Sequence, residues 1–229
     1  MNAARTVLIT GGTGGLGVAT VTAFVAAGWR VVTPIRPGTA DRLPAGAVAV
    51  ECDLTMASDV TAASEAAAGD PDAPLRAVVN LAGGFAAGGL VAETPVEDFE
   101  AILRTNLRPT YLVTAATLPD LVAAGGGSIV CVSSRAAVAP FPGAAGYATA
   151  KAAVLAFANA VAVEYRRQGV RCNTVLPSVI DTPANRSAMP DADTSRWVRP
   201  AEIAEVILFL ASEASGATSG AQIPVYGQA

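Results

Sequence analysis

Histidine is absent from this chain of 229 residues. A Ser-His-Asp hydrolase, a metal centre held by imidazole and a histidine general base are therefore all excluded. Cysteine is scarce: Cys52, Cys131 and Cys172 are far apart and form neither a CxxC pair nor a zinc-ligand spacing. We expect buried free thiols in a reducing, cytoplasmic compartment, and no metal site.

Charged residues and long apolar runs are also few. Charged residues make up 15% of the chain, the net charge is −4 and no basic run occurs, so nucleic acid is not an expected partner. No stretch reaches membrane-spanning length without Gly, Pro or charge, and the apolar run in MNAARTVLIT is too short for a signal peptide. We therefore expect no membrane partner.

What the chain does have is apolar surface to bury and a regular alternation of patterns. Apolar residues make up 52% of it, and no repeat or linker divides it, so we expect a single domain over residues 1–229. Short apolar segments predict strands at residues 6–10, 30–35, 47–51, 76–80, 128–133, 170–176 and 221–226. Helical patterns follow at residues 18–25, 59–68, 95–124, 147–167 and 200–209.

The third helix is expected to begin with a capping box from Thr94 to Glu97, with Pro95 at the first helical position. Strands without polar alternation are buried on both faces. The alternation therefore predicts an α/β fold, a doubly wound parallel sheet of about seven strands with helices on both faces.

A glycine-rich loop, TGGTGGLG at residues 10–17, joins the first strand to the first helix. Glycines let the backbone turn sharply and approach a ligand, and a helix N-terminus presents free N–H groups to a phosphate. No Lys-Ser or Lys-Thr follows, so the loop is not a P-loop. Its position after the first strand favours a dinucleotide site over a plain flexible turn.

The stretch GYATAKA at residues 146–152 places Tyr147 and Lys151 four residues apart, on one face of a helix. A tyrosine hydroxyl titrates near ~10 and is a poor acid at neutral pH, but a nearby ammonium lowers its pKa. The pair is a candidate proton-transfer device, with the phenol as the acid and the lysine as its tuner. An incidental pair on an exposed helix face is the alternative.

In combination, these motifs resemble the short-chain dehydrogenase/reductase family over nearly the full length. The matching positions are Thr10, Gly11, Gly15 and Gly17 in the loop, Asn80-Leu81-Ala82-Gly83 after the fourth strand, Asn106 in the next helix, Ser134 thirteen residues before Tyr147, Tyr147 with Lys151, and Asn173 and Pro177 around the sixth strand. The resemblance implies a Rossmann-type fold and an NAD(P)-dependent oxidoreductase that transfers a hydride between the cofactor and a small-molecule carbonyl or secondary alcohol.

The resemblance also implies four catalytic residues. Tyr147 would donate a proton to a carbonyl oxygen, or accept one from an alcohol, and Ser134 would hydrogen-bond that oxygen. Lys151 would lower the pKa of Tyr147 and hold the nicotinamide ribose. Asn106 would hold a water that links Lys151 to solvent; an alternative is that it caps a helix break before Pro109.

A cofactor site follows from the same resemblance. The expected contacts are Gly11, Thr13, Gly14, Gly15, Leu16, Gly17, Arg36, Asp53, Leu54, Asn80, Ala82, Gly83, Tyr147, Lys151, Pro177, Ile180 and Thr182. Asp53 would bind the adenine edge, with a turn-forming role as the alternative. Asn80 and the Ala82-Gly83 backbone would line the adenosine ribose. Pro177, Ile180 and Thr182 would hold the nicotinamide amide and the pyrophosphate.

Arg36 bears on the choice of cofactor. An acidic residue at the end of the second strand would select NAD by binding the ribose 2′-hydroxyl. Here Ile35 has that position and Arg36 follows, which resembles NADP-preferring members, where an arginine pairs with the 2′-phosphate. We favour NADP(H). NAD(H) stays open, because Arg36 also reads as a solvated loop charge and the glycine-rich residues 82–89 are similar to NADH-using, dihydropteridine-reductase-like members.

Two other functions are considered, a non-redox enzyme on the same scaffold (isomerase, dehydratase or cyclase) and a nucleotide-sensing binding protein. Both would be expected to have an altered catalytic set, whereas Asn106, Ser134, Tyr147 and Lys151 are all present. Candidate substrate-wall residues are Phe85, Arg135, Phe141, Met189 and Trp197, each also explained by packing. Because apolar candidates outnumber charged ones, a mostly apolar substrate is expected.

The resemblance further implies a homo-oligomer, a dimer or a tetramer. Its interface would use the helices at 95–124 and 147–167. Small residues would allow close helix approach: Ala150, Ala152, Ala153, Ala156, Ala158 and Ala160. Packing of that helix against its own sheet is the alternative explanation of these alanines.

Overall fold

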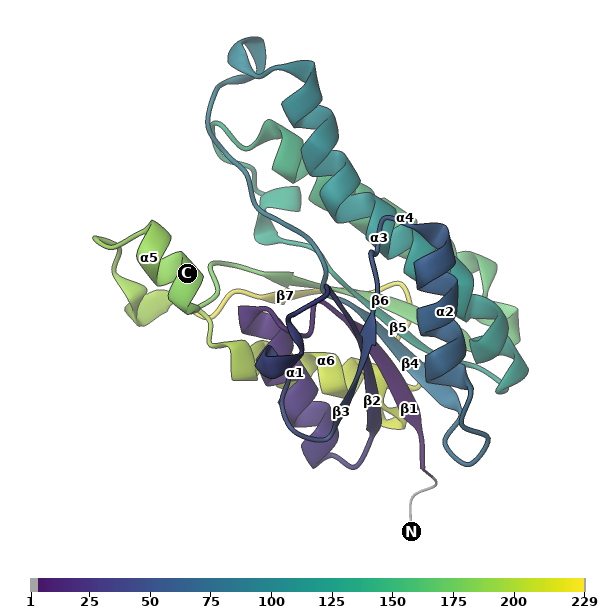
Figure 1. Ribbon diagram of the computed structural model, residues 1–229. Coiled ribbons are helices and arrows are strands. Elements are labelled where there is room, and N and C mark those ends of the chain that lie inside the picture. Colours follow the sequence, from purple (N-terminus) through teal and green to yellow (C-terminus); the bar gives the residue numbers. More distant parts are fainter. Residues whose placement is uncertain (1–3, 229) are drawn as a thin grey trace.

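A parallel sheet with a helix after almost every strand organises the chain. The computed structural model describes residues 4–228. The strands are β1 Thr6–Thr10, β2 Arg30–Ile35, β3 Ala47–Glu51, β4 Leu75–Asn80, β5 Gly127–Val132, β6 Val170–Pro177 and β7 Gln222–Val225. The helices are α1 Gly15–Ala26, α2 Ala57–Ala68, α3 Val96–Ala123, α4 Ala145–Glu164, α5 Pro183–Ala188 and α6 Pro200–Ala211 (Figure 1).

The strand order is β3-β2-β1-β4-β5-β6-β7, and every neighbouring pair is parallel. The chain winds outward from β1 to β3, returns to the centre, and winds the other way from β4 to β7. The order therefore reverses between β1 and β4, and parallel sheets bind ligands beyond the carboxyl ends of strands at such a point. The predicted doubly wound sheet is confirmed.

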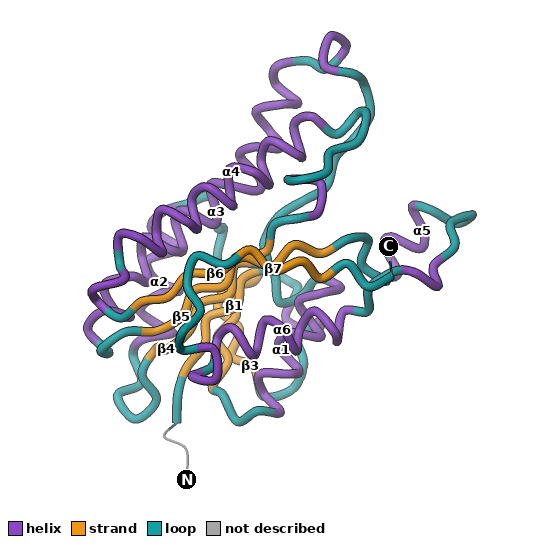
Figure 2. Tube along the Cα trace, turned by 180° about the vertical axis from the view of Figure 1, so that it is seen from behind, coloured by secondary structure: helices purple, strands orange, loops and turns teal. Residues whose placement is uncertain are grey.

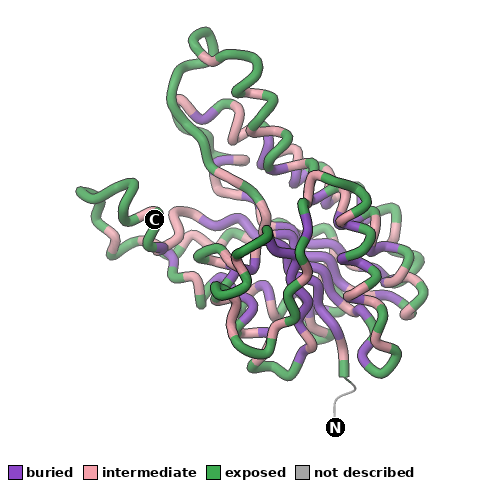
Figure 3. Tube along the Cα trace, in the orientation of Figure 1, coloured by how far each residue is buried: buried purple, intermediate pink, exposed green. Residues whose placement is uncertain are grey.

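Helices cover both faces of the sheet (Figure 1, Figure 2). On one face, α1 and α6 bury Phe24 and Ile207 against it. On the other, α2, α3 and α4 form a second core that includes Val113 and Val154. Strand residues alternate between these cores, so the central strands are buried throughout, as Figure 3 shows. This two-sided burial explains their almost wholly apolar sequences.

Two local predictions are corrected. The Thr94–Glu97 capping box does not form: α3 begins at Val96 without a side-chain cap, and the Thr94 hydroxyl donates to the carbonyls of Gly89 and Leu90. Helix α5 was not anticipated. Its signal is Thr182 followed by Pro183, because the Thr182 hydroxyl caps the helix by accepting from the Asn185 N–H.

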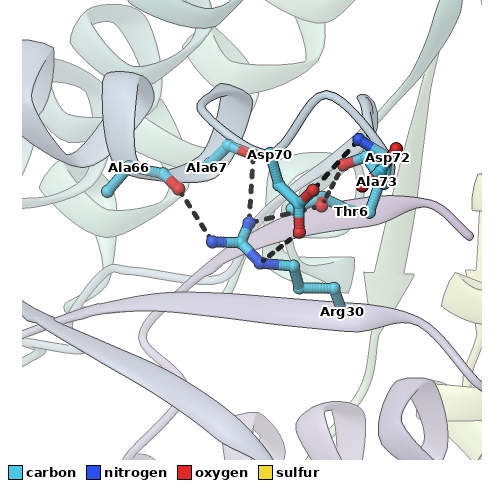
Figure 4. Close-up of polar contacts among 7 residues, drawn as sticks. All are labelled: Thr6, Arg30, Ala66, Ala67, Asp70, Asp72 and Ala73. Atoms are coloured by element: carbon cyan, nitrogen blue, oxygen red, sulfur yellow. Dashed lines mark hydrogen bonds and ion pairs between the residues drawn. The ribbon is translucent and has the colours of Figure 1, made fainter.

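Arg30 and Thr6 are the first residues of β2 and β1, at the opposite end of these strands from the glycine loop. Hydrogen bonds of the Arg30 side chain join α2 to the sheet there (Figure 4). Its guanidinium donates to the carbonyls of Ala66 at 3.1 Å and Ala67 at 3.3 Å. It also donates to Thr6 and lies 3.6 Å from the Asp70 carboxylate. The last carbonyls of a helix have no partner within it, so one arginine satisfies two of them here.

Among the helices of residues 4–228, α4 alone is long and apolar enough to cross a membrane, judged by length and composition. It packs in the α2–α4 core, where Val154, Ala158 and Val161 are buried. Contacts within the protein therefore account for part of its apolar surface.

Candidate active site

The four predicted catalytic residues come from α3, α4 and the loop directly after β5, and they meet at the carboxyl edge of the sheet. The Lys151 ammonium lies 5.9 Å from the centroid of the Tyr147 ring. A β-carbon built on Gly83 would lie 2.5 Å from Asn106 Oδ1 and 3.2 Å from Lys151 Nζ. Ser134 lies close enough to Tyr147 to lower the pKa of its hydroxyl. The structure thus brings together a phenol, a hydroxyl, an ammonium and an amide that the sequence separates by up to 45 positions.

Lys151 is held deep in the protein, with 6% of its surface exposed. Its ammonium donates to the Val132 carbonyl at 3.1 Å. Burial lowers the pKa of Lys151 to about 8, because an ammonium is poorly solvated there. A lysine in this range exchanges its proton readily near neutral pH.

Tyr147 differs from the sequence prediction. Burial raises the pKa of its hydroxyl, and the hydrogen bond from Ser134 lowers it by less. The predicted lowering of the Tyr147 pKa by Lys151 is wrong for this structure. The reason is that the loss of solvation around the Tyr147 hydroxyl disfavours the phenolate more than the interaction with Ser134 favours it.

Asn106 is fully buried inside an unbroken α3, so the suggested helix break before Pro109 does not occur. Its amide nitrogen donates to the carbonyls of Gly84 and Ile102, both at 3.0 Å. Its amide oxygen accepts from the Gly84 N–H at 3.2 Å. Asn106 therefore ties the segment after β4 to α3, directly beside Lys151.

The glycine loop is built as a close-approach turn. Gly11 has a φ of +69°, and a β-carbon on Gly17 would lie 2.0 Å from the Gly11 carbonyl oxygen, so larger residues do not fit. A β-carbon on Gly15 would lie 2.6 Å from the Thr182 side chain, which places Thr182 beside the loop as predicted.

No side chain of the described residues caps α1, which leaves its first N–H groups available to an anion. Gly14 and Gly15, at the start of that helix, are exposed, and Thr13 is half-buried. The Thr10 hydroxyl accepts from the N–H groups of Leu81 and Ala82, both at 3.1 Å, so the loop is joined to the segment that leads to Gly83. These features fit a dinucleotide phosphate.

Two residues expected around the adenosine, Arg36 and Asp53, differ in how free their side chains are to contact a ligand. Arg36 is exposed directly after β2, and among the described residues no acidic side chain pairs with it. The Asp53 carboxylate accepts from the N–H and the hydroxyl of Thr55, at 2.9 and 2.7 Å, so the turn-forming alternative describes its local role. The hydrogen bond from the Thr55 backbone lowers the pKa of Asp53.

Asn80 is placed differently from the prediction. Its side chain is 3% exposed and donates to Thr114 of α3 at 3.1 Å and to the Cys131 sulfur at 3.8 Å. The amide therefore faces the α2–α4 core and leaves only the Ala82-Gly83 backbone to line a ribose. The physical reason is the strand alternation, which turns Asn80 toward α3.

The remaining predicted contacts sit at strand ends and on the flanking cores. Leu54 packs on the α2–α4 core, and Leu16 and Ile180 pack on the α1–α6 core. Pro177 is the buried last residue of β6.

Sequence reasoning gave no role to two residues near the site. Ser133 is buried and its hydroxyl donates to the Lys151 carbonyl at 2.8 Å. Tyr226 lies 5.0 Å from the Arg135 guanidinium, which packs over its ring. No sequence signal identifies Tyr226, because it meets Arg135 only through the pairing of β5 with β6 and of β6 with β7. Ser133 could have been noticed as the residue next to Ser134.

Of the candidate wall residues, Phe85 and Phe141 lie at the site. The Phe85 ring is 5.0 Å from the Tyr147 ring and 6.4 Å from the Phe141 ring. Met189 ends α5, and Trp197 follows the short helix Thr194–Arg196, in the segment that projects beside the C-terminus (Figure 1).

Comparison with known proteins decides the family. The family model described as short chain dehydrogenase matches residues 5–193. The chain belongs to the short-chain dehydrogenase family. Members of this family bind nicotinamide cofactors, and the similar curated proteins carry dehydrogenase or reductase names, so the chain is an oxidoreductase.

Three relatives of this dehydrogenase illustrate the similarity. It is 32% identical to 2-(R)-hydroxypropyl-CoM dehydrogenase of Xanthobacter autotrophicus, over 97% of each chain. It is 32% identical to the 3-oxoacyl-(acyl-carrier-protein) reductase MabA of Mycobacterium tuberculosis, over 97% of this chain and 92% of the relative. The structure of a short-chain type dehydrogenase/reductase from Mycobacterium ulcerans matches with a TM-score of 0.90 at 28% identity, over 98% of this chain and 89% of that one.

Proposed function

We propose that this short-chain dehydrogenase transfers a hydride between a nicotinamide cofactor and a carbonyl or secondary alcohol of a small molecule, with Tyr147 as general acid and base. The observation that carries the proposal is the convergence of Ser134, Tyr147 and Lys151 at the segment that is hydrogen-bonded to the glycine loop. Hydride donors need only to be held and oriented, whereas the proton must come from the protein.

The chain's own residues divide the work. A bound nicotinamide cofactor supplies or accepts the hydride. In the reducing direction, the Ser134 hydroxyl and the Tyr147 phenol hold the carbonyl oxygen, and the phenol proton moves to that oxygen as the alcohol forms. Lys151, with a pKa of about 8, returns a proton to the phenolate. Asn106 holds the backbone beside Lys151 and offers the place for a water that reaches solvent.

NADP(H) is the preferred cofactor in this proposal. Arg36 supports it, since this guanidinium is exposed at the carboxyl end of β2, where the ribose 2′ position is recognised in sheets of this type. A phosphate there would gain charge-assisted hydrogen bonds that a hydroxyl does not offer.

The substrate class follows from the chemistry and from the relatives. The names of the two curated relatives point to a hydroxypropyl compound and to a 3-oxoacyl group, that is, a secondary alcohol and a ketone. We expect a small molecule with either group, in the cytoplasm, and neither nucleic acid nor membrane as a partner.

A homo-oligomer is part of the proposal, with a second copy of this chain on the outer face of α3 and α4. That face has a groove of about 490 Å³ lined by Leu103, Arg104, Leu107, Arg108, Tyr111, Ala153 and Phe157. The first turn of α3 is acidic, through Glu97 and Asp98, so a two-fold partner in antiparallel register would meet the groove arginines with opposite charge. Ala158 is buried in the chain's own core. Only some of the small residues between Ala150 and Ala160 are therefore available for a contact with the second copy. A monomer at micromolar concentration in sedimentation would contradict it.

The proposed function is tested by titrating the protein with NADPH and NADH, following nicotinamide fluorescence, and then measuring NADPH oxidation with ketones. Tyr147→Phe is expected to abolish turnover while the Kd for NADPH stays within about twofold, because it removes only the transferable proton. Turnover retained by Tyr147→Phe would remove Tyr147 as the acid. Absence of binding by either nucleotide would overturn the redox assignment, whereas binding without turnover of any ketone would favour the non-redox or sensing alternatives.

A further inference from the structure

Two phenylalanines stand exposed beside the catalytic tyrosine. Phe85 is 65% exposed and Phe141 is 47% exposed, although both rings are in aromatic contact. The Phe85 ring meets the Tyr147 ring edge to face at 5.0 Å. We call Phe85 and Phe141 the aromatic wall. Large apolar side chains left exposed next to a reactive group are typical of a binding surface.

The aromatic wall is built by two loops that are fixed to each other. Phe85 lies in the segment 81–95 after β4, and Phe141 lies between β5 and α4; Figure 3 shows much of the first segment as exposed. The Gly88 N–H donates to the Gly143 carbonyl at 2.9 Å. Gly143 has a φ of +80°, and a β-carbon there would lie 2.5 Å from the Gly88 oxygen, so only glycine allows this approach.

Asn106 fixes Phe85 from the other side. Its amide hydrogen-bonds both the N–H and the carbonyl of Gly84, the residue that precedes Phe85. The position of the Phe85 ring relative to Tyr147 is therefore set by backbone contacts as well as by ring packing. A wall fixed in this way is preorganised for a rigid ligand group.

The parts of the two loops around Phe85 and Phe141 carry no charged side chain. Neither residues 82–92 nor residues 136–150 contain a charged side chain. The nearest charge in sequence, Arg135, packs over the Tyr226 ring beyond β7. The Lys151 ammonium lies 5.9 Å from the centroid of the Tyr147 ring, but it donates to the Val132 carbonyl and belongs to the catalytic group. At the wall itself, an apolar ring would replace exposed ring surface with contact.

We propose that the aromatic wall holds the substituent of the reacting carbon, and that the preferred substrates are ketones and secondary alcohols with an aromatic ring next to that carbon. Because Phe85 contacts Tyr147, a group attached directly to a carbonyl bound by Tyr147 reaches the wall. This inference rests on the proposed function and adds the substrate class.

The test compares three ketones with NADPH: acetophenone, cyclohexyl methyl ketone, which has the same carbon skeleton without aromaticity, and butanone. The expected kcat/KM for acetophenone exceeds that for cyclohexyl methyl ketone by about 10-fold, the factor that a favourable aromatic pair contributes. Phe85→Ala and Phe141→Ala should each raise the KM for acetophenone by about 10-fold and leave the KM for butanone and the Kd for NADPH unchanged.

Two further variants sharpen the result. Phe85→Leu keeps an apolar side chain without a ring, so it should reduce the preference for acetophenone while retaining activity toward cyclohexyl methyl ketone. Val91→Ala is the matched control, since Val91 is 75% exposed on the same segment and contributes no ring. It should change none of the three KM values.

The outcomes separate the two claims. Turnover of butanone without preference for acetophenone overturns the aromatic wall and leaves the proposed function standing. NADPH binding with no turnover of any ketone overturns the proposed function. The substrate-binding role of the aromatic wall, which rests on that function, is then overturned as well. Dissociation of an oligomer in Phe85→Ala, with unchanged KM values, would assign the rings to a subunit contact and overturn their substrate role.

Discussion

The hydroxyl of Ser133, the residue directly after β5, donates to the main-chain carbonyl of Lys151 in α4 at 2.8 Å, inside the protein. The next residue after Ser133 is Ser134, so this bond ties the strand end that carries the substrate-binding hydroxyl to the helix that carries Tyr147 and Lys151. The Lys151 ammonium returns the contact by donating to Val132 at 3.1 Å. Two hydrogen bonds, from Ser133 to Lys151 and from Lys151 to Val132, thus join the end of β5 to α4 beside the active site.

Ser133→Ala is expected to destabilise the protein by about 1–2 kcal/mol, since it removes a buried hydrogen bond, and to lower kcat by about 10-fold with KM nearly unchanged. Urea unfolding and steady-state kinetics measure the two effects. Thr22→Ala, which removes an exposed hydroxyl donating to Val18, is the control and should alter neither. An unaltered kcat in Ser133→Ala would limit the bond to a structural role.

The buried Lys151 makes stability depend on pH in a defined direction. Its pKa is about 8 when folded and 10.5 when unperturbed, so between these values the unfolded chain binds the extra proton. Stability therefore rises with pH across this window. Relative to Lys151→Met, the wild type should gain about 2 kcal/mol between pH 8 and pH 10. Urea melts without added nucleotide measure this; a flat difference would mean that Lys151 titrates normally.

Gly83→Ala is expected to reduce kcat by about 10-fold or more. The added β-carbon would lie 2.5 Å from Asn106 Oδ1, so the Asn106 amide must move away from Gly84 and from its place beside Lys151. The control is Gly88→Ala, because nothing lies within 4 Å of a β-carbon there. Equal kcat values for the two variants would contradict the role assigned to the Asn106–Lys151 contact.

Arg36→Ala should weaken NADPH binding by about 10- to 100-fold and leave NADH binding nearly unchanged, because only the 2′-phosphate forms charge-assisted hydrogen bonds with a guanidinium. Fluorescence titration with each nucleotide measures both constants. Arg42→Ala, an exposed arginine six residues further along, controls for the general loss of positive charge. A similar loss of affinity for both nucleotides would show that Arg36 does not select NADPH over NADH.

Arg30→Ala should destabilise the protein by about 1–3 kcal/mol, since the carbonyls of Ala66 and Ala67 lose a charged donor. Nucleotide affinity should not change, because these contacts lie at the amino ends of the strands (Figure 4). Thermal and urea unfolding measure the loss, with Arg166→Ala on the surface as a control. A loss no larger than that of Arg166→Ala would show that water replaces the guanidinium without cost.

Periodicity identified the strands to within a residue or two at each end because central parallel strands are apolar on both faces. Helix ends were less well predicted. α3 lacks the capping box that its residues allow, since Thr94 finds nearer carbonyl partners at Gly89 and Leu90. α5 was missed because a helix of six residues leaves no periodic pattern.

Local sequence was sufficient to predict the alternation of strands and helices that gives a parallel sheet, the glycine turn at Gly11 and the pairing of Tyr147 with Lys151, because each is encoded by residues close together along the chain. Tertiary structure alone decided that Asn80 turns inward, that burial raises the pKa of Tyr147, and that Phe85 and Phe141 meet beside it. Burial and ring contact depend on which segments, distant in sequence, pack together in space. No local sequence pattern encodes that packing.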